Sequence, residues 1–148
     1  HEVFSAMFKD RTIQKTYIAI VCGHPEKEGV IDFPIGRHTT IRNKMTHKIG
    51  GRESKTRYKV KQYFDDYTLV EAYPETGRTH QIRVHLTTIG HPLVSDKMYG
   101  KSYHALKRQA LHASAVTFNF KNKSYSFTIP LPGDMKNLLI HLKKISQL

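Results

Sequence analysis

Residues 75–90 read ETGRTHQIRVHLTTIG and place arginines and histidines directly among apolar side chains. The spacing of the apolar residues predicts a helix over residues 80–89. Thr79 has the side chain of an N-cap residue, and Gly90 suits the left-handed position that often ends a helix. The stretch therefore predicts a short amphipathic helix with unusually many cations.

The apolar side of this helix would consist of Ile82, Leu86 and Ile89, which share one stripe. Arg83 would lie about 100° round from Ile82, at the edge of that stripe and close to the core boundary. Two interpretations follow. The helix is a buried structural element with one solvated side, or it forms part of a site that holds an anion or a polar base in a dry pocket.

The remaining sequence predicts an α+β domain with a mostly antiparallel mixed sheet and flanking helices. No repeat, low-complexity tract or linker divides the chain, so residues 1–148 are expected to form one domain or a portion of one. The other predicted elements are a helix over 2–10, a strand over 14–22, a hairpin of 56–64 with 67–73, a hairpin of 110–120 with 124–131, and a last helix capped by Asp134.

The charge of the chain predicts a polyanionic partner. Lysine and arginine total 24 against 12 acids, a formal charge of +12, and 39% of the residues are hydrophobic. A folded domain with this excess of cations favours nucleic acid over membranes or acidic proteins. The alternative is a basic protein without such a partner. Cys22 is the single cysteine, which excludes an intrachain disulfide and favours the reducing cytoplasm.

The most basic stretch covers residues 36–62, with nine arginines and lysines and one acid, Glu53. Its second part alternates with period two and would direct Arg57, Lys59 and Lys61 to one side of a strand. That side is either an ordinary solvated face or an edge that contacts phosphates, and we favour the second. The candidate RNA-binding residues are Arg37, Arg42, Lys44, Lys48, Arg78 and His80.

Familiar catalytic motifs are missing from the sequence. It contains no phosphate-binding loop, no dinucleotide fingerprint, no zinc finger and no H-E-x-x-H. His80 and His85 fall on different helical rows, so we predict no metal site. Asp96 follows the predicted helix, where an aspartate in a turn usually accepts local hydrogen bonds. The residues alone indicate a basic nucleic-acid-binding domain and leave its chemistry open.

Four separated stretches carry a resemblance to a known family. Residues 75–100, with TGRTHQIRVH followed by GHP and YG, resemble the signature of RluA-type RNA pseudouridine synthases. KTYIAIVCG at 15–23, IDFPI at 31–35 and RQALHA at 108–113 are similar to further segments of that family, in the same order. The resemblance runs from about residue 2 to residue 140. It implies the catalytic-domain fold of those enzymes.

The resemblance implies isomerisation of uridine to pseudouridine in ribosomal or transfer RNA, without a metal or other cofactor. In the family a carboxylate engages the ribose. The tyrosine matching Tyr17 stacks on the uracil and is the proposed base for the C5 proton. The arginine matching Arg83 pairs with the carboxylate. The basic residues 37–61 would hold backbone phosphates while the target uridine is flipped out.

One family element is missing from the sequence, namely the H-R-L-D-x-x-T-S-G stretch that carries the catalytic aspartate. We therefore expect residues 1–148 to be the C-terminal portion of one catalytic domain, inactive alone, or else a degenerate paralogue. His1 as first residue favours the portion. The alternatives are a non-catalytic RNA-binding module that keeps the synthase fold, and a basic structural protein of a ribonucleoprotein. No obligate protein partner and no membrane association are predicted.

Overall fold

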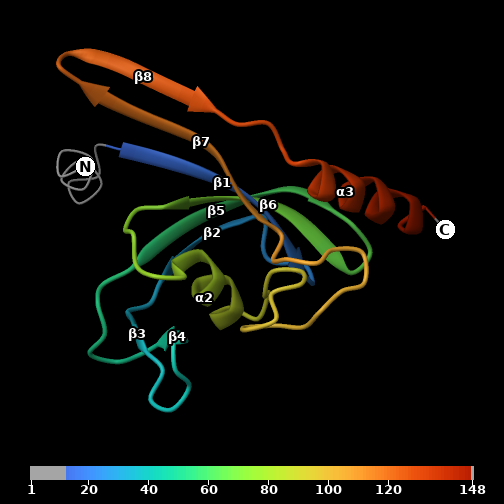
Figure 1. The fold of residues 1–148 in the computed structure, drawn as a ribbon, viewed down its shortest axis with the longest axis horizontal. Coiled ribbons are helices and arrows are strands. Elements are labelled where there is room, and N and C mark those ends of the chain that lie inside the picture. Colours follow the sequence, from blue (N-terminus) through green and yellow to red (C-terminus); the bar gives the residue numbers. More distant parts are fainter. Residues whose placement is uncertain (1–12, 148) are drawn as a thin grey trace.

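A computed structural model describes residues 13–147 of the chain (Figure 1). Its main sheet has six strands in the order β2-β5-β6-β1-β7-β8, and every pairing among the described strands is antiparallel. The predicted α+β class is thus confirmed, whereas the predicted helix over 2–10 lies outside the described residues. The main-sheet strands are β1 (Ile13–Cys22), β2 (Glu28–Asp32), β5 (Lys55–Tyr63), β6 (Tyr67–Pro74), β7 (Leu111–Phe120) and β8 (Lys123–Thr128).

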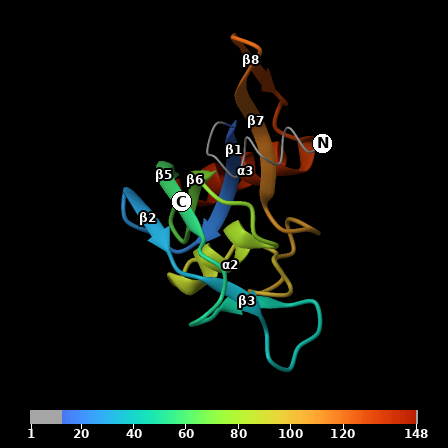
Figure 2. The ribbon, with the colours of Figure 1, turned by 90° about the vertical axis from the view of Figure 1, so that its left-hand side faces the viewer.

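A second, two-stranded sheet and two helices complete the described fold. The small sheet pairs β3 (Ile35–Arg37) with β4 (Met45–His47), and the helices are α2 (Gln81–Thr88) and α3 (Gly133–Ile145). Helix α2 lies against one face of the main sheet, near the small sheet, and α3 lies on the other side (Figures 1 and 2). Neither helix is long and apolar enough to cross a membrane.

Strand β1 organises the core because its alternate residues enter two separate apolar clusters. Ala19 and Val21 belong to one cluster with Leu86 of α2. Ile20 points to the opposite face and belongs to a second cluster with Leu142 of α3. All of these side chains are fully buried. This explains why the sequence of β1 is apolar on both faces, as a strand covered on both sides must be.

The hairpin of β5 and β6 confirms the strand pair predicted for residues 56–64 and 67–73. The hairpin does not lie at the edge of the sheet. Strand β5 pairs with β2 on its other side over Lys55–Lys59, so this part of β5 is interior to the sheet and offers no free edge to phosphates. Two of its four cations lie near acids, with Arg57 3.7 Å from Glu75 and Lys61 3.2 Å from Glu71. These contacts favour the ordinary solvated face over the phosphate-contacting edge that the sequence suggested.

The predicted start of α2 is wrong, while its predicted end is confirmed. His80, not Thr79, is the N-cap, with a left-handed φ of 56°. Gly90 has φ of 89°, and the amide of His91 donates to the carbonyl of Leu86 at 2.9 Å. This bond belongs to a Schellman motif, which needs a residue that tolerates positive φ at the position of Gly90.

The predicted cap of α3 is also displaced. The N-cap is Pro132, and Asp134 lies inside the first turn. Its carboxylate receives two hydrogen bonds from Arg108, at 2.9 and 3.0 Å, and Arg108 precedes β7. The acid therefore connects the helix to the preceding segment as well as lying near the positive end of the helix dipole.

Candidate active site

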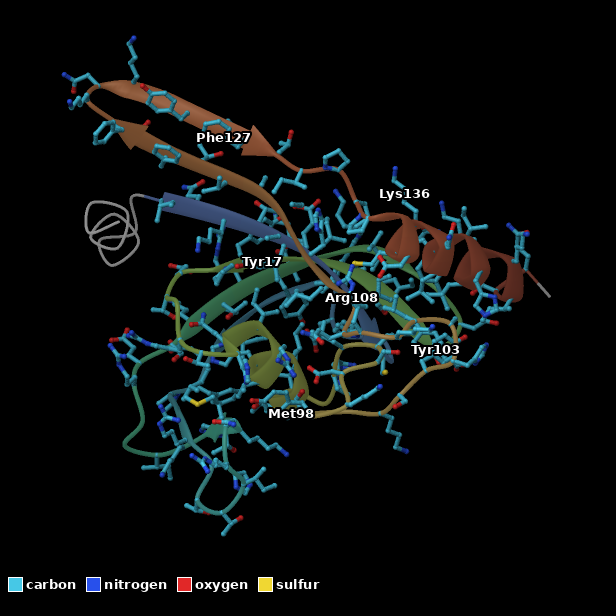
Figure 3. All side chains as sticks on the ribbon, viewed as in Figure 1. Tyr17, Met98, Tyr103, Arg108, Phe127 and Lys136 are labelled. Carbon is cyan, nitrogen blue, oxygen red and sulfur yellow. The ribbon has the colours of Figure 1, made fainter. Side chains whose placement is uncertain are left out.

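A cavity of about 770 Å³ opens over β1, the loop 75–80 and the beginning of α2. Tyr17 and Arg83 both line it, as do the sequence-predicted residues Arg78 and His80. Figure 3 labels Tyr17 near the middle of the sheet, on the strand that separates the two cores. The structure thus brings the two predicted catalytic residues to one cavity.

Tyr17 has small neighbours on both sides. Its Cα partners are Ala72 in β6 and Ala113 in β7, and the β1–β7 register shifts between Thr16 and Tyr17. A bulge of this kind often redirects a side chain beside a functional site. Partial burial raises the pKa of Tyr17, so its hydroxyl is protonated at neutral pH. The ring, set among small side chains, is suited to stack on a base.

Arg83 forms a two-pronged ion pair with Asp96. Its Nε lies 2.8 Å from Oδ2 and its Nη2 lies 2.9 Å from Oδ1. Asp96 is fully buried, and the side chain of Arg83 is 14% exposed. The hydrogen bonds to Asp96 raise the pKa of Arg83 above its ordinary value, so the guanidinium stays charged. Among the described residues the acid that pairs with Arg83 is therefore Asp96, a partner that the sequence analysis did not predict.

This pairing leaves part of the guanidinium available. The hydrogen bonds of Arg83 to described residues use Nε and Nη2, so Nη1 can still serve another acceptor. Asp96 is not among the residues that line the cavity, and Glu75 is the one acid among the described residues that do. Asp96 therefore positions Arg83 and is not placed to reach a ribose.

Besides pairing with Arg83, Asp96 accepts hydrogen bonds within its own turn, as the sequence predicted. Its Oδ1 accepts hydrogen bonds from the amides of Met98 and Tyr99, each at 3.3 Å. The turn after α2 is therefore arranged round the same carboxylate that holds Arg83. Sequence reasoning did not foresee the pair because residues 83 and 96 lie on separate segments whose approach depends on tertiary packing.

Tyr99 is a site residue that the sequence analysis missed. Its hydroxyl accepts a hydrogen bond from the amide of Met45 at 2.9 Å and lies 2.8 Å from Nδ1 of His80. Its ring lies 5.0 Å from Cζ of Arg83 and 5.5 Å from Nζ of Lys44. Tyr99 thus connects the small sheet to α2. The YG pair at 99–100 was part of the family signature, but the sequence did not indicate which residues Tyr99 would contact.

His80 contacts the hydroxyl of Tyr99 as a neutral side chain. Burial, and next the charge of Arg83, lower the pKa of His80 below its usual value. Since the Tyr99 hydroxyl accepts from Met45, its own proton is free to donate to an unprotonated Nδ1 of His80. The lowered pKa therefore favours a neutral imidazole for His80 at neutral pH.

The loop 75–80 is fixed by Gln81, a second residue that the sequence analysis missed. The Gln81 Oε1 atom accepts hydrogen bonds from the Thr76 hydroxyl at 2.6 Å and from the Arg78 amide at 3.0 Å. Its Nε2 donates to the Lys55 carbonyl at 2.9 Å and to the Thr56 hydroxyl oxygen at 3.0 Å. One buried amide therefore attaches the wall of the cavity to strand β5.

His85 is a structural residue on the buried side of α2. The Thr56 hydroxyl lies 2.8 Å from its Nδ1, and its Nε2 lies 2.9 Å from the Phe33 carbonyl oxygen. Because that hydroxyl can donate to Nδ1 while Nε2–H donates to the carbonyl, both contacts are satisfied by a neutral imidazole. Burial lowers the pKa of His85, which agrees with this state.

We expect the stability of the chain to fall as the pH drops below about 6.5, the ordinary pKa of histidine. His85 and His80 have lowered pKa values in the folded state, so the unfolded chain takes up protons first. The free energy of unfolding then decreases by at most about 1.4 kcal/mol per pH unit for each group. Urea unfolding at pH 7.5 and 5.5 measures this. His85→Gln should be less stable but less sensitive to pH; an unchanged pH dependence would contradict the assignment.

The predicted RNA-binding residues fall into two groups. Arg78 and His80 line the cavity, and Arg78 also donates from Nε to the Glu53 carbonyl at 2.8 Å. The others lie on the excursion 36–48 that carries the small sheet, at the opposite end of the molecule from the β7–β8 hairpin (Figure 2). These residues are Arg37, Arg42, Lys44 and Lys48.

Comparison with known proteins identifies the family. The sequence model of the family described as "RNA pseudouridylate synthase" matches residues 1–88. The chain is 40% identical to "Ribosomal large subunit pseudouridine synthase D" of Nitrosomonas europaea, covering 93% of this chain and 43% of that protein. The protein of the same name from Zymomonas mobilis is 39% identical, covering 99% of this chain and 50% of that protein. The chain therefore belongs to the RNA pseudouridylate synthase family.

Solved structures agree with this assignment. "Human RNA Pseudouridylate Synthase Domain Containing 1" superposes with a TM-score of 0.75 at 29% identity, over 86% of this chain and 58% of that one. "Human RNA Pseudouridylate Synthase Domain Containing 4" gives a TM-score of 0.78 at 24% identity, over 96% and 67%, and shows the shared fold. The chain spans about half the length of the curated relatives it matches.

Proposed function

We propose that this chain forms one side of the active site of an RNA pseudouridine synthase. The observation that carries the proposal is the shared cavity, in which a stacking ring and a fixed guanidinium face the same space. Membership of the family supplies the reaction. The proposed substrate is a uridine in structured RNA. Because relatives are named for the large ribosomal subunit, ribosomal RNA is preferred over transfer RNA.

The proposed reaction is an isomerisation. The bond between ribose C1′ and uracil N1 breaks, a bond from C1′ to C5 forms, C5 loses a proton and N1 gains one. Tyr17 stacks on the uracil. Its hydroxyl first loses its own proton to water in the open cavity, and the oxygen then takes the C5 proton, while N1 takes up a proton from water. Arg83, held by Asp96, directs Nη1 at a carboxylate that acts on the ribose.

We propose that this carboxylate lies outside the 148 residues, which then form the C-terminal portion of one catalytic domain. Two acids lie near the site. Asp96 is fully buried and engaged by Arg83, and Glu75 lines the cavity but lies 3.7 Å from the guanidinium of Arg57. Neither is placed as a free nucleophile. The length of the relatives, about twice that of this chain, supports a second contributing segment.

The test uses the completed protein, meaning these 148 residues in one polypeptide with the carboxylate-bearing half. Ribosomal RNA is incubated with it and digested, and the nucleosides are separated by chromatography. Pseudouridine, of the same mass as uridine, is expected to appear in amounts that grow with time. Absence of any new nucleoside from ribosomal and transfer RNA alike would contradict the proposed function. The free thiol of Cys22 fits a cytoplasmic location for this reaction.

Neutralising the excursion 36–48 is expected to weaken RNA binding and its dependence on salt. The variant replaces Arg42, Lys44 and Lys48 with glutamine. Each lost phosphate contact to single-stranded RNA lowers the slope of log K against log[salt] by about 0.7, so the slope should fall by up to roughly 2. Fluorescence anisotropy with a labelled RNA at several salt concentrations measures this.

The matched control removes the same charge from α3, on the other face of the sheet. It replaces Lys136, Lys143 and Lys144, which are exposed there. The control is expected to keep most of the affinity and slope. Equal losses in both variants would show that net charge alone, and not the excursion, determines RNA binding.

A further inference from the structure

Tyr99 is partly buried and does not line the cavity of the candidate active site. Its hydroxyl, its ring and its backbone amide each contact a different part of the structure. A phenylalanine would fill the space of the ring, so packing alone does not explain the hydroxyl. Burying a polar group is unfavourable unless it is hydrogen-bonded, so the role of the hydroxyl lies in the partners that it holds.

The hydroxyl of Tyr99 joins two segments that are far apart in the sequence. It accepts a hydrogen bond from the amide of Met45 in β4 at 2.9 Å, and it lies 2.8 Å from Nδ1 of His80. Burial raises the pKa of Tyr99 and lowers that of His80, so at neutral pH the hydroxyl keeps its proton and donates it to Nδ1. His80 is the N-cap of α2. One hydroxyl therefore connects the small sheet to the start of α2.

The ring of Tyr99 lies beside the guanidinium of Arg83. The Cζ atom of Arg83 is 5.0 Å from the ring centroid, within the range of a cation–π contact. Arg83 belongs to the first turn of α2, the turn that His80 caps. The hydroxyl and the ring of one residue therefore act on the same helical turn.

Tyr99 also belongs to the tight turn that carries Asp96. The Asp96 carboxylate accepts a hydrogen bond from the Tyr99 amide at 3.3 Å, and the Asp96 carbonyl accepts one from the Gly100 amide at 2.6 Å. A Cβ atom at position 100 would lie 3.1 Å from Cβ of Pro92, so glycine allows this turn to pack closely. The acid and the ring that hold Arg83 therefore form one compact unit.

The small sheet connects this unit to the proposed RNA-binding cations. Met45 directly follows Lys44, and Nζ of Lys44 lies 5.5 Å from the centroid of the ring that contacts Arg83. A phosphate bound by Lys44 would therefore lie at a defined distance from the guanidinium. Such a distance matters because a displacement of about 1 Å at a reacting centre can slow a reaction by about 100-fold.

We propose that Tyr99 is a positioning residue for the isomerisation, and that it sets the distance between the excursion 36–48 and the guanidinium of Arg83. Because Tyr99 does not line the cavity, it acts through Arg83 and not on the uridine itself. The inference rests on the proposed function, since it concerns how the proposed active site is aligned with its RNA.

The test compares Tyr99→Phe with the matched control Tyr103→Phe in the completed protein. Tyr103 is also partly buried, and its hydroxyl lies 3.1 Å from Nε2 of His141, away from Tyr17 (Figure 3). Each variant loses one hydroxyl that contacts a histidine, and thermal unfolding followed by circular dichroism measures any loss of stability. The single-turnover rate at saturating protein is expected to fall at least about tenfold for Tyr99→Phe and to stay within about twofold for Tyr103→Phe. The RNA affinity of both should change by less than about threefold, because the cations of the excursion remain.

A double variant separates positioning from a general structural role. If Tyr99 acts through Arg83, Tyr99→Phe/Arg83→Lys should be no slower than Arg83→Lys, because the group that Tyr99 positions is already lost. Rate losses that multiply in the double variant would overturn the proposal. So would equal slowing by Tyr99→Phe and Tyr103→Phe, or a loss of RNA affinity without a loss of rate.

A second measurement does not depend on turnover. The Nε–H group of Arg83 is observed by nuclear magnetic resonance in the completed protein with isotope-labelled arginine, and its signal is assigned by its absence from Arg83→Lys. This group should exchange with solvent at least about tenfold faster in Tyr99→Phe than in the unchanged protein or in Tyr103→Phe. Unchanged exchange would overturn the proposal, whether or not pseudouridine forms. Faster exchange in a protein that forms no pseudouridine supports the positioning of Arg83 and contradicts only the proposed function.

Discussion

Replacing Arg83 with lysine in the completed protein is expected to lower turnover by at least about 100-fold while RNA affinity changes little. Lysine keeps the charge but cannot hold Asp96 through two parallel hydrogen bonds and also offer a third nitrogen to another acceptor. The guanidinium geometry, rather than the charge alone, is therefore what the substitution removes. Single-turnover rates at saturating protein and anisotropy binding curves measure the two quantities.

Stability must be separated from catalysis at this position. Arg83→Ala leaves a fully buried carboxylate without its partner, and breaking such a pair costs about 3–5 kcal/mol. The matched variant Arg83→Gln/Asp96→Asn removes both charges and should regain most of that stability. It is expected to remain inactive, because the glutamine that replaces Arg83 presents no cation. Normal turnover in the double variant would show that Arg83 serves the fold alone.

Removing the hydroxyl of Tyr17 is expected to reduce turnover of the completed protein by about 10²–10⁴-fold, the usual contribution of a positioned acid or base. Tyr17→Phe retains the ring between its small neighbours, so folding and RNA affinity should be preserved. Tyr17→Leu removes the stacking surface as well and should also weaken binding of RNA with an unpaired uridine. Turnover of Tyr17→Phe within about twofold of the unchanged protein would contradict the proton-accepting role.

The pH dependence gives an independent check on Tyr17. Burial raises the pKa of Tyr17, so the deprotonated phenol is a minor species at neutral pH. As long as the pH stays below this pKa, the deprotonated fraction grows about tenfold for each unit by which the pH rises. Release of tritium from C5 of labelled uridine is therefore expected to accelerate between about pH 7 and 9. Tyr17→Phe should lack this rise. An equal rise in both proteins would assign it to another group.

The sequence predicted the strands and the apolar side of α2 because these depend on local periodicity. The apolar run along β1 and the stripe through Ile82 and Leu86 hold in the structure, where both of these helix side chains are buried. The meeting of Tyr17 and Arg83 followed from the resemblance and not from spacing. Their shared cavity is a tertiary result that periodicity cannot supply.

The errors share a physical origin. The N-cap of α2 is His80 because contacts with Tyr99 and the small sheet outweigh the intrinsic preference for Thr79. The pair of Arg83 with Asp96 was missed because an aspartate in a turn has a sufficient local explanation. Such pairings depend on how separate segments pack, so neither composition nor helical spacing reveals them.

The most direct test of the account measures tritium release from C5-labelled uridine RNA by the 148-residue chain alone and by the completed protein. The account predicts release by the completed protein and none by the chain alone, because the described residues around the cavity offer no free carboxylate. Robust release by the chain alone, lost on changing Glu75 to glutamine, would place the nucleophile inside these residues and contradict the account.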